Sequence, residues 1–400
     1  MESFLNDISG RYAPMKKLIL NLCVNDGYFT LSELSREIGA SIPKTSRIIA
    51  EMIKEGYVIE MGKLDSASGR HPSIYGLNPG AGYFVGIEVN ANTLNLAVTD
   101  FKGRIVDYTD RYPCRLEGTE ESVLHLCATV RKYLDGLGID QSRIRAYGVN
   151  LTGRVNHNTG FSYSYFISES RPIRDVLQEG FGGPVFVEND SRGMAYGEYV
   201  CGVARDEGTI LFLNVGWGLG MGIILDGQLF YGKSGFSGEV GHFPLLDNNR
   251  ICHCGKKGCT ETGASGRALH RIFTEKLKDG QTSCLSEKFR TTGNVSLEDI
   301  LEAIREEDVT AIESVEEVGA TLGRAIAGLI NIFNPDLVII GGRLSAAEKY
   351  LMPPLNSTVN KLTLTLVNND TTIKVSKLGK QAGAVGASLL SKIRLLNQQA

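Results

Sequence analysis

The sequence predicts an α/β protein in two parts: a small N-terminal domain of helices with a β-hairpin, and a larger body of two α/β lobes. Three observations support this prediction. The first 80 residues hold three helical patterns followed by two short strand patterns. A Pro/Gly-rich turn at residues 78–82 marks a boundary. Beyond it, an apolar pattern of strand, turn and strand occurs twice, about 125 residues apart.

Length and composition are those of an ordinary globular protein. The 400 residues are 42% apolar, which suggests two or three domains. The net charge is −3, so any contact with nucleic acid must come from a local patch. The chain starts without a signal-peptide pattern, and no apolar stretch approaches the length of a membrane span. We therefore expect a cytoplasmic protein that does not contact membranes.

The N-terminal domain begins with a helical pattern over residues 14–26. Its expected apolar face consists of Met15, Leu18, Ile19 and Leu22. Thr30 begins a second helix, with Glu33 in the position of a capping box. A third helix is expected from about residue 42 to 55. Strands over residues 57–61 and 73–77 complete a hairpin.

Three helices and a hairpin in this order predict a winged helix-turn-helix. Such a domain places the third helix in the DNA major groove and its hairpin loop against the backbone or minor groove. The expected DNA-binding residues, exposed between the apolar positions or at the loop tip, are Lys44, Thr45, Ser46, Arg47 and Arg70. Between residues 41 and 72, five basic residues stand against four acidic ones, so shape supports DNA binding better than charge does. A protein-interaction winged helix is the alternative.

The larger body contains the duplicated pattern. Strands over residues 83–89 and 94–100 are echoed by strands that begin at residues 209 and 223. Each set is followed by further helical and strand patterns. Such a duplication predicts two α/β lobes with a ligand cleft between them.

One stretch of the second lobe predicts a metal site. Four residues within eighteen positions offer nitrogen and sulfur ligands: His242, Cys252, Cys254 and Cys259. Zinc favours four such ligands in a structural site, and Gly255 and Gly258 permit the positive φ angles of a tight loop. Free thiols or a disulfide are the alternatives, although a Cys-x-Cys pair is too short for an ordinary disulfide. His253 is a possible substitute ligand.

Two carboxylates, Glu239 and Glu261, bracket this stretch. A zinc ion with four ligands does not need them. They are therefore free to accept hydrogen bonds from a polyhydroxylated ligand.

Residues 239–261 resemble the signature of the ROK family of repressors and sugar kinases: Glu-x-Gly-His, then Cys-x-Cys-Gly-x-x-Gly-Cys-x-Glu. The resemblance covers residues 80–400. It implies a two-lobed actin- and hexokinase-like (ribonuclease H-like) body, with the C-terminal helix packed on the first lobe. The expected domains are then a winged helix-turn-helix (1–80), a first lobe (81–190 with 378–400) and a second lobe with the zinc motif (191–377).

The resemblance also implies sugar contacts by Asn189, Asp190, Glu239, His242 and Glu261, with Asp190 in the position of the kinase base. An Asx turn at a helix start is the alternative for Asp190. The family's first phosphate loop, Asp-x-Gly-x-Thr, is replaced here by residues 88–93, which contain no glycine and begin with glutamate. The second loop keeps glycines at residues 216–220 but carries Trp217, where a small hydroxyl residue is expected.

Intact sugar residues beside altered phosphate loops predict a sensor derived from a kinase. We expect a repressor of carbohydrate metabolism that binds operator DNA as a homodimer or tetramer. Its effector is a sugar or a sugar phosphate, and its zinc is structural. The alternatives are an active ROK sugar kinase with an accessory DNA-binding domain, and a winged-helix scaffold with a vestigial zinc lobe.

Overall fold

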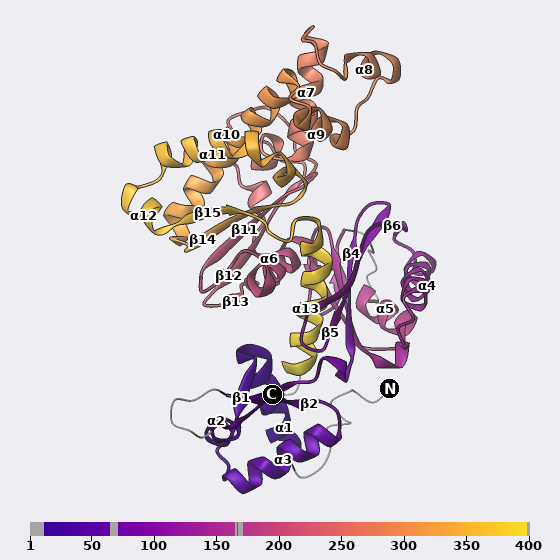
Figure 1. Cartoon of the computed structure of the whole chain (residues 1–400). Coiled ribbons are helices and arrows are strands. Elements are labelled where there is room, and N and C mark those ends of the chain that lie inside the picture. The colour runs from indigo at the N-terminus through magenta and orange to yellow at the C-terminus, as the bar shows by residue number, and fades with distance from the viewer. Residues whose placement is uncertain (1–11, 65–70, 165, 167–170, 398–400) are drawn as a thin grey trace. The chain divides into compact units, whose positions relative to one another are not determined.

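A computed structural model describes residues 12–64, 71–164, 166 and 171–397. The chain divides into two compact units, one made of Met1–Asp190 with Gly383–Ala400 and the other of Ser191–Ala382. Both are drawn in Figure 1, from indigo at the N-terminus to yellow at the C-terminus. Among the described residues, no helix is long and apolar enough to cross a membrane.

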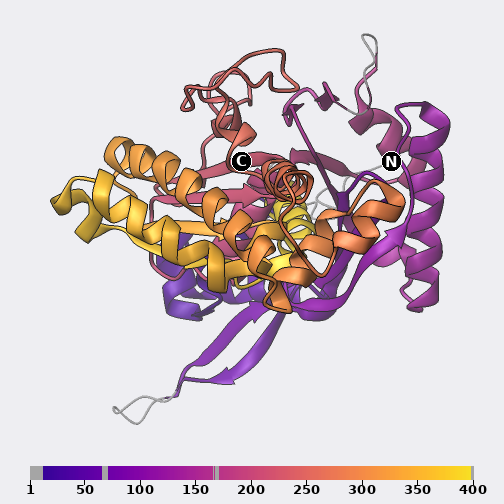
Figure 2. The same cartoon turned by 90° about the horizontal axis from the view of Figure 1, so that it is seen from above.

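The first unit begins with a winged helix-turn-helix. Its helices are α1 (Ala13–Asp26), α2 (Leu31–Glu37) and α3 (Ile42–Lys54). Its antiparallel sheet has the order β1-β3-β2, with β1 (Tyr28–Thr30), β2 (Val58–Lys63) and β3 (Ser73–Leu77). The β2–β3 hairpin extends away from the rest of its unit (Figure 2). The predicted capping box at the start of α2 is present.

The apolar face predicted for α1 was wrong at Leu18, which is 42% exposed. The buried face carries Ile19, Leu20 and Cys23 instead. Lys16 is also buried on this face, because its ammonium group lies 3.3 Å from Glu51 of α3 and 2.5 Å from Glu55, which follows that helix directly. Hydrophobicity alone could not reveal a buried lysine that depends on partners in another helix.

The rest of the first unit is an α/β lobe. Its five-stranded sheet has the order β10-β7-β4-β5-β6, with β4 (Tyr83–Val89), β5 (Thr93–Asp100), β6 (Ile105–Pro113), β7 (Ile144–Leu151) and β10 (Val185–Asn189). Its helices are α4 (Glu120–Gly136), α5 (Ile173–Phe181) and α13 (Ala382–Asn397), and a small sheet pairs β8 (Val155–Asn156) with β9 (Phe161–Ser162). Short 3₁₀ turns occupy Pro79–Ala81 and Gln141–Arg143.

Helices cover both faces of this sheet. Alternate residues of β4, including Val85 and Ile87, pack under α4 and α5. On the opposite face α13 lies directly on the backbone of β4 and β7. A Cβ atom at Gly86 would lie 1.8 Å from the carbonyl oxygen of Ala384, and one at Gly148 would lie 1.9 Å from that of Ala387. Only glycine permits this close approach.

The end of α13 also joins the core of the winged helix-turn-helix. Leu395 and Leu396 belong to one buried cluster with Ile19, Leu34 and Ile48. The first and last helices of the chain therefore share a single apolar core.

The second unit is also an α/β lobe. Its sheet order is β13-β12-β11-β14-β15, with β11 (Ile210–Val215), β12 (Leu219–Leu225), β13 (Gln228–Leu229), β14 (Leu337–Gly341) and β15 (Thr372–Val375). Its helices are α6 (Asp190–Cys201), α7 (Gly266–Lys278), α8 (Ser286–Thr292), α9 (Leu297–Arg305), α10 (Val309–Phe333), α11 (Glu348–Leu362) and α12 (Thr365–Asp370). Short 3₁₀ turns occupy Val240–His242, Thr260–Thr262, Arg343–Ala347 and Gly379–Gln381.

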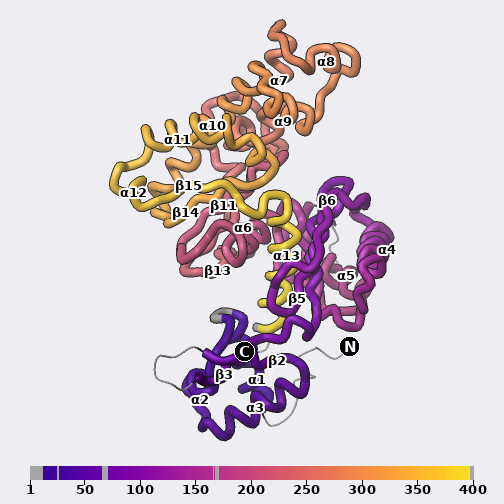
Figure 3. The backbone as a smooth tube through the Cα atoms, in the orientation of Figure 1, coloured from indigo at the N-terminus to yellow at the C-terminus, as the bar shows by residue number. Residues whose placement is uncertain are grey.

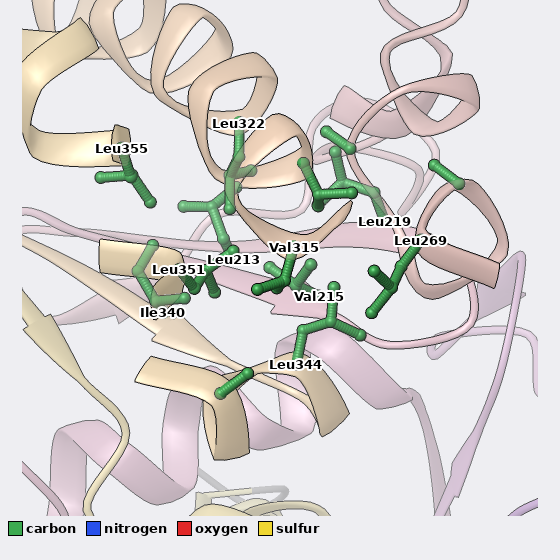
Figure 4. Close-up of a cluster of buried hydrophobic side chains, with 14 of the residues drawn as sticks. Leu213, Val215, Leu219, Leu269, Val315, Leu322, Ile340, Leu344, Leu351 and Leu355 are labelled. Atoms are coloured by element: carbon green, nitrogen blue, oxygen red, sulfur yellow. The ribbon is translucent and has the colours of Figure 1, made fainter. Parts of the chain in front are cut away.

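The main core of this unit lies between its sheet and helices α7, α9, α10 and α11. Figure 4 shows Leu213 and Val215 of β11 pointing toward Val315 and Leu322 of α10. A smaller cluster on the other face joins the sheet to α6. The path of the chain through this unit can be followed in Figure 3.

Candidate functional site

The four predicted metal ligands lie together in the second unit. One ligand atom each from His242, Cys252, Cys254 and Cys259 falls within 4.8 Å of all the others. His242 ends the turn Val240–His242, and Cys259 immediately precedes the turn Thr260–Thr262. Gly255 and Gly258 have φ angles of 83° and 78°, as the predicted tight loop requires.

The spacing of these atoms fits a tetrahedral zinc ion. Zinc–sulfur bonds of about 2.3 Å place the ligand atoms of a tetrahedron about 3.8 Å apart. The sulfur atoms of Cys254 and Cys259 are 3.6 Å apart, and Cys252 Sγ lies 3.7 Å from His242 Nδ1. Three thiols and one imidazole are a donor set typical of structural zinc.

The surroundings of each thiol shift its pKa. Burial raises the pKa of Cys252 and of Cys259, whereas a hydrogen bond from the backbone N–H of Lys256 lowers the pKa of Cys254. Because zinc binds thiolates, metal uptake would release protons from the two buried cysteines.

The carboxylate of Glu261 adjoins this cluster. It is 7% exposed, accepts a 2.8 Å hydrogen bond from Cys252 and lies 2.6 Å from His253 Nδ1. His242, His253 and Glu261 form a second possible ligand group. Glu239 lies 3.9 Å from His242 Nε2, so the two ring nitrogens of His242 face different partners. The loop therefore joins the metal ligands directly to two carboxylates.

Asn189 and Asp190 lie in the first unit, at the junction of β10 and α6. The side-chain amide of Asn189 donates to the carbonyl of Gly153 and to the carboxylate of Asp190, both at 2.9 Å. Asp190 is the first residue of α6. This position at the end of a strand agrees with a ligand-binding role and equally with the alternative of a turn at a helix start.

The β4–β5 turn and the β11–β12 turn differ in their glycine content, as their sequences suggest. In the β4–β5 turn, Asn90 N–H donates to the carbonyl of Thr93, and Asn90 and Ala91 carry side chains where glycine is absent. The β11–β12 turn keeps Gly216 and Gly218, and Trp217 between them is 47% exposed.

At the start of α3, Ser46 and Arg47 are exposed and Lys44 is half-buried. The prediction that Thr45 is exposed was wrong. Its side chain is fully buried, and its hydroxyl donates to the carbonyl of Ser41. Arg70 lies outside the described residues.

Comparisons with known proteins agree with this geometry. Residues 84–394 match the ROK family, and residues 14–59 match a winged helix-turn-helix DNA-binding domain. The chain belongs to the ROK family. The sequence-based prediction of the family and of its two-part fold is therefore confirmed.

The ROK relatives of this chain include both repressors and sugar kinases. A xylose repressor from Caldicellulosiruptor bescii is 28% identical over 93% of each chain. A glucokinase from Halalkalibacterium halodurans is 30% identical over 78% of this chain and 95% of its own. A crystal structure of a ROK family transcriptional regulator, described as a homolog of the E. coli MLC protein, matches with a TM-score of 0.79. It is 27% identical and covers 95% of this chain and 96% of its own. The similarity to the regulators thus extends over both parts of the chain.

Sequence reasoning missed three arginines beside the metal cluster. Arg250, Arg267 and Arg271 line one pocket together with Glu261. The spacing of Arg267 and Arg271, four residues apart at the start of an amphipathic helix, was a signal that could have found two of them.

Proposed function

We propose that this ROK protein is a sugar-responsive transcriptional repressor with a structural zinc ion. One observation carries the proposal: a single chain holds both a winged helix-turn-helix and a loop in which possible metal ligands adjoin two carboxylates, Glu239 and Glu261. A kinase has no need of the first part, and a simple DNA-binding protein has no need of the second.

Operator DNA is the macromolecular partner in this proposal. Lys44, Ser46 and Arg47 contact the major groove, and Arg70 contacts the DNA from the hairpin loop. Thr45 instead fixes the first turn of α3 through its hydrogen bond to Ser41. A homodimer presents two such helices to a two-part operator.

Polar side chains recognise the effector in this proposal. Sugar hydroxyls form hydrogen bonds with Glu239, His242 and Glu261, and also with Asn189 and Asp190. Zinc bound by His242 and the three cysteines fixes the loop that bears these groups, as outer ligands orient a site. The sugar changes the affinity for DNA because it binds one of two states of the repressor more tightly.

Phosphoryl transfer is absent in this proposal. Glu88 and Asn90 replace the Asp and Gly of the family's first phosphate loop, so phosphate cannot approach the backbone there. Trp217 adds an indole to the second loop. Sugar kinase activity is the second candidate, favoured by the similarity to glucokinases.

A thermal-shift screen of the zinc-loaded protein distinguishes the two candidates. A ligand at a hundred times its dissociation constant adds about 2.7 kcal/mol to the stability of the folded state. We expect a sugar or sugar phosphate to raise the melting temperature and ATP with magnesium to leave it unchanged. A clear shift with ATP, or release of ADP with sugar, would support the kinase instead.

The role of zinc is tested with Cys259→Ser. We expect loss of bound zinc by metal analysis and loss of the sugar response in operator-binding titrations. The matched control is Cys201→Ser, which changes an exposed cysteine outside the metal cluster. A Cys259→Ser protein that still released DNA with sugar would disprove the link between zinc and sensing.

A further inference from the structure

A pocket of about 330 Å³ lies beside the zinc-motif loop, wholly within the second unit. Its lining includes three arginines, Arg250, Arg267 and Arg271, together with Cys252, His253 and Glu261. This volume is at the lower end of the range of small-molecule sites. The three guanidinium groups distinguish this pocket chemically from the rest of the loop at residues 239–261.

The charges around the pocket are not balanced. Arg250 and Arg271 share a single carboxylate, that of Glu275, at 3.2 Å and 2.7 Å. Glu261, the other carboxylate, is already engaged by His253 and Cys252. Burial lowers the pKa of Arg271. Three arginines but only one carboxylate, that of Glu261, thus line the pocket.

Arg267 supplies the surplus charge. Its side chain is exposed, and it forms no ion pair within the described part of the chain. Its guanidinium lies 5.7 Å from the centre of the Trp217 ring, and this contact holds the group in place without using its N–H donors. Since Arg271 follows four residues later on α7, both arginines project from the same side of the helix.

The backbone N–H groups at the start of α7 do not bind the ligand, because they are already used. Gly266 and Arg267 donate to the carbonyls of Gly216 and Trp217, and Ala268 donates to the hydroxyl of Ser265. An anion in this pocket must therefore be held by the arginine side chains. Their planar donor pairs match the oxygens of a phosphate group.

We propose that this pocket binds the phosphate of a phosphorylated sugar, so that the effector is a sugar phosphate ester and not the free sugar. The inference rests on the proposed sugar-sensing function, since Glu261 belongs both to the pocket and to the sugar-binding set. The sugar ring lies at Glu261, and its phosphate extends toward Arg267 and Arg271.

Isothermal titration of the zinc-loaded, full-length protein tests this inference. The probes are glucose, xylose and N-acetylglucosamine, each as free sugar and as phosphate ester, together with inorganic phosphate and glucuronate. We expect the best ester to bind at least about tenfold more tightly than its free sugar, the equivalent of one charged hydrogen bond. Glucuronate tests whether a carboxylate serves as well as a phosphate.

Arg267→Gln is the decisive variant, because an exposed side chain without an ion-pair partner is not needed for folding. It should weaken binding of the ester about tenfold and leave binding of the free sugar unchanged. Arg290→Gln, which changes an exposed arginine of α8 outside the pocket, is the matched control and should alter neither. Equal affinities for ester and free sugar, tighter binding of glucuronate, or an unaffected Arg267→Gln protein would each overturn the inference.

Failure of the underlying function gives a different result. If free sugars release operator DNA and phosphate adds nothing, sensing stands and the phosphate site is disproved. If no sugar of either kind binds or releases DNA, the sensing function is wrong. Inorganic phosphate then tests the pocket alone: binding that Arg267→Gln weakens supports the anion site, and absence of binding overturns it.

Discussion

The two lobes of this protein have the same strand topology but different polar residues at the same position. In each sheet the first three strands in sequence form an antiparallel set, and two later strands add parallel to the first strand of that set. Strand β4 of the first lobe thus corresponds to β11 of the second. The penultimate residue is Glu88 in β4 and Asn214 in β11.

Both residues contact the start of a helix that crosses the back of their sheet. The carboxylate of Glu88 lies against Gly383 in the first turn of α13, where a Cβ atom would approach it to 2.3 Å. The amide of Asn214 donates to the hydroxyl of Ser191 in the first turn of α6, at 3.2 Å. One scaffold therefore joins strand to helix with a buried carboxylate in one lobe and with a neutral amide in the other.

This difference shows how a duplicated fold tolerates different polar groups at equivalent positions. In the first lobe a carboxylate fills the space beside the positive end of α13, where the helix dipole favours a negative charge. The second lobe keeps the smaller amide and the glycines of its turn.

The largest effects should come from the glycines on which the crossing helices rest. Gly86→Ala and Gly148→Ala place a methyl group within 2 Å of a carbonyl oxygen of α13, and Gly222→Ala places one 2.5 Å from the Cβ atom of Ala195 in α6. We expect each to reduce the free energy of unfolding by about 3 kcal/mol or more. Chemical denaturation measures this loss. Gly328→Ala, in open space on α10, should instead raise stability by about 0.5–1 kcal/mol.

Replacing Glu88 or Asn214 should reduce the free energy of unfolding by unequal amounts, smaller than those of the glycine variants. Glu88→Ala removes the acceptor of a 2.7 Å hydrogen bond from the Asn95 side-chain amide and the charge beside α13. We expect it to cost about 2–3 kcal/mol, and Asn214→Ala about 1 kcal/mol. Glu88→Gln keeps the shape and removes the charge. If Glu88→Gln were as stable as the unchanged protein, the proposed interaction with the helix dipole would be wrong.

The smallest effects should come from helix caps. Helix α9 has a full capping box of Ser296 and Asp299, whereas α4 has only the hydroxyl of Thr119. A hydrogen bond from Lys288, with help from Ser296, lowers the pKa of Asp299 to about 2. The carboxylate therefore stabilises the fold above its unfolded-state pKa of about 4, and this contribution is lost as the pH falls toward 2.

Asp299→Asn should cost about 1 kcal/mol at pH 7 and clearly less at pH 2, where the carboxyl is half protonated, with Thr119→Ala costing about 0.5 kcal/mol at both. Hydrogen exchange of α9 and α4 reports the two helices separately. If the amides of α9 were equally protected from hydrogen exchange in the Asp299→Asn and unchanged proteins at pH 7, the capping box would contribute nothing to the stability of this helix.

The features that the sequence predicted correctly involve residues that lie close together in the chain. The capping box of Thr30 and Glu33 spans four residues, and the metal ligands span eighteen, so their spacing alone placed them together. Lys16 could not be predicted to be buried, because its partners Glu51 and Glu55 lie far along the chain, in α3 and directly after it. The pocket arginines likewise meet only through tertiary packing.

The error at Thr45 was avoidable. Thr45, Ile48, Ile49 and Met52 follow the helical spacing of a single buried face. Classifying threonine as polar concealed a pattern that the apolar positions already defined. The polar side chain of Thr45 suggested exposure, whereas the helical periodicity correctly indicated burial.

The buried cluster that α1 shares with α13 has a consequence for how the N-terminal domain folds. Leu395 and Leu396 of α13 complete an apolar cluster that includes Ile19 of α1. Because these contacts join residues far apart in the sequence, the winged helix-turn-helix reaches its full packing only when α13 is in place. A substitution that shortens a side chain of α13, such as Leu395→Ala, would therefore loosen the N-terminal domain while leaving every residue of that domain unchanged.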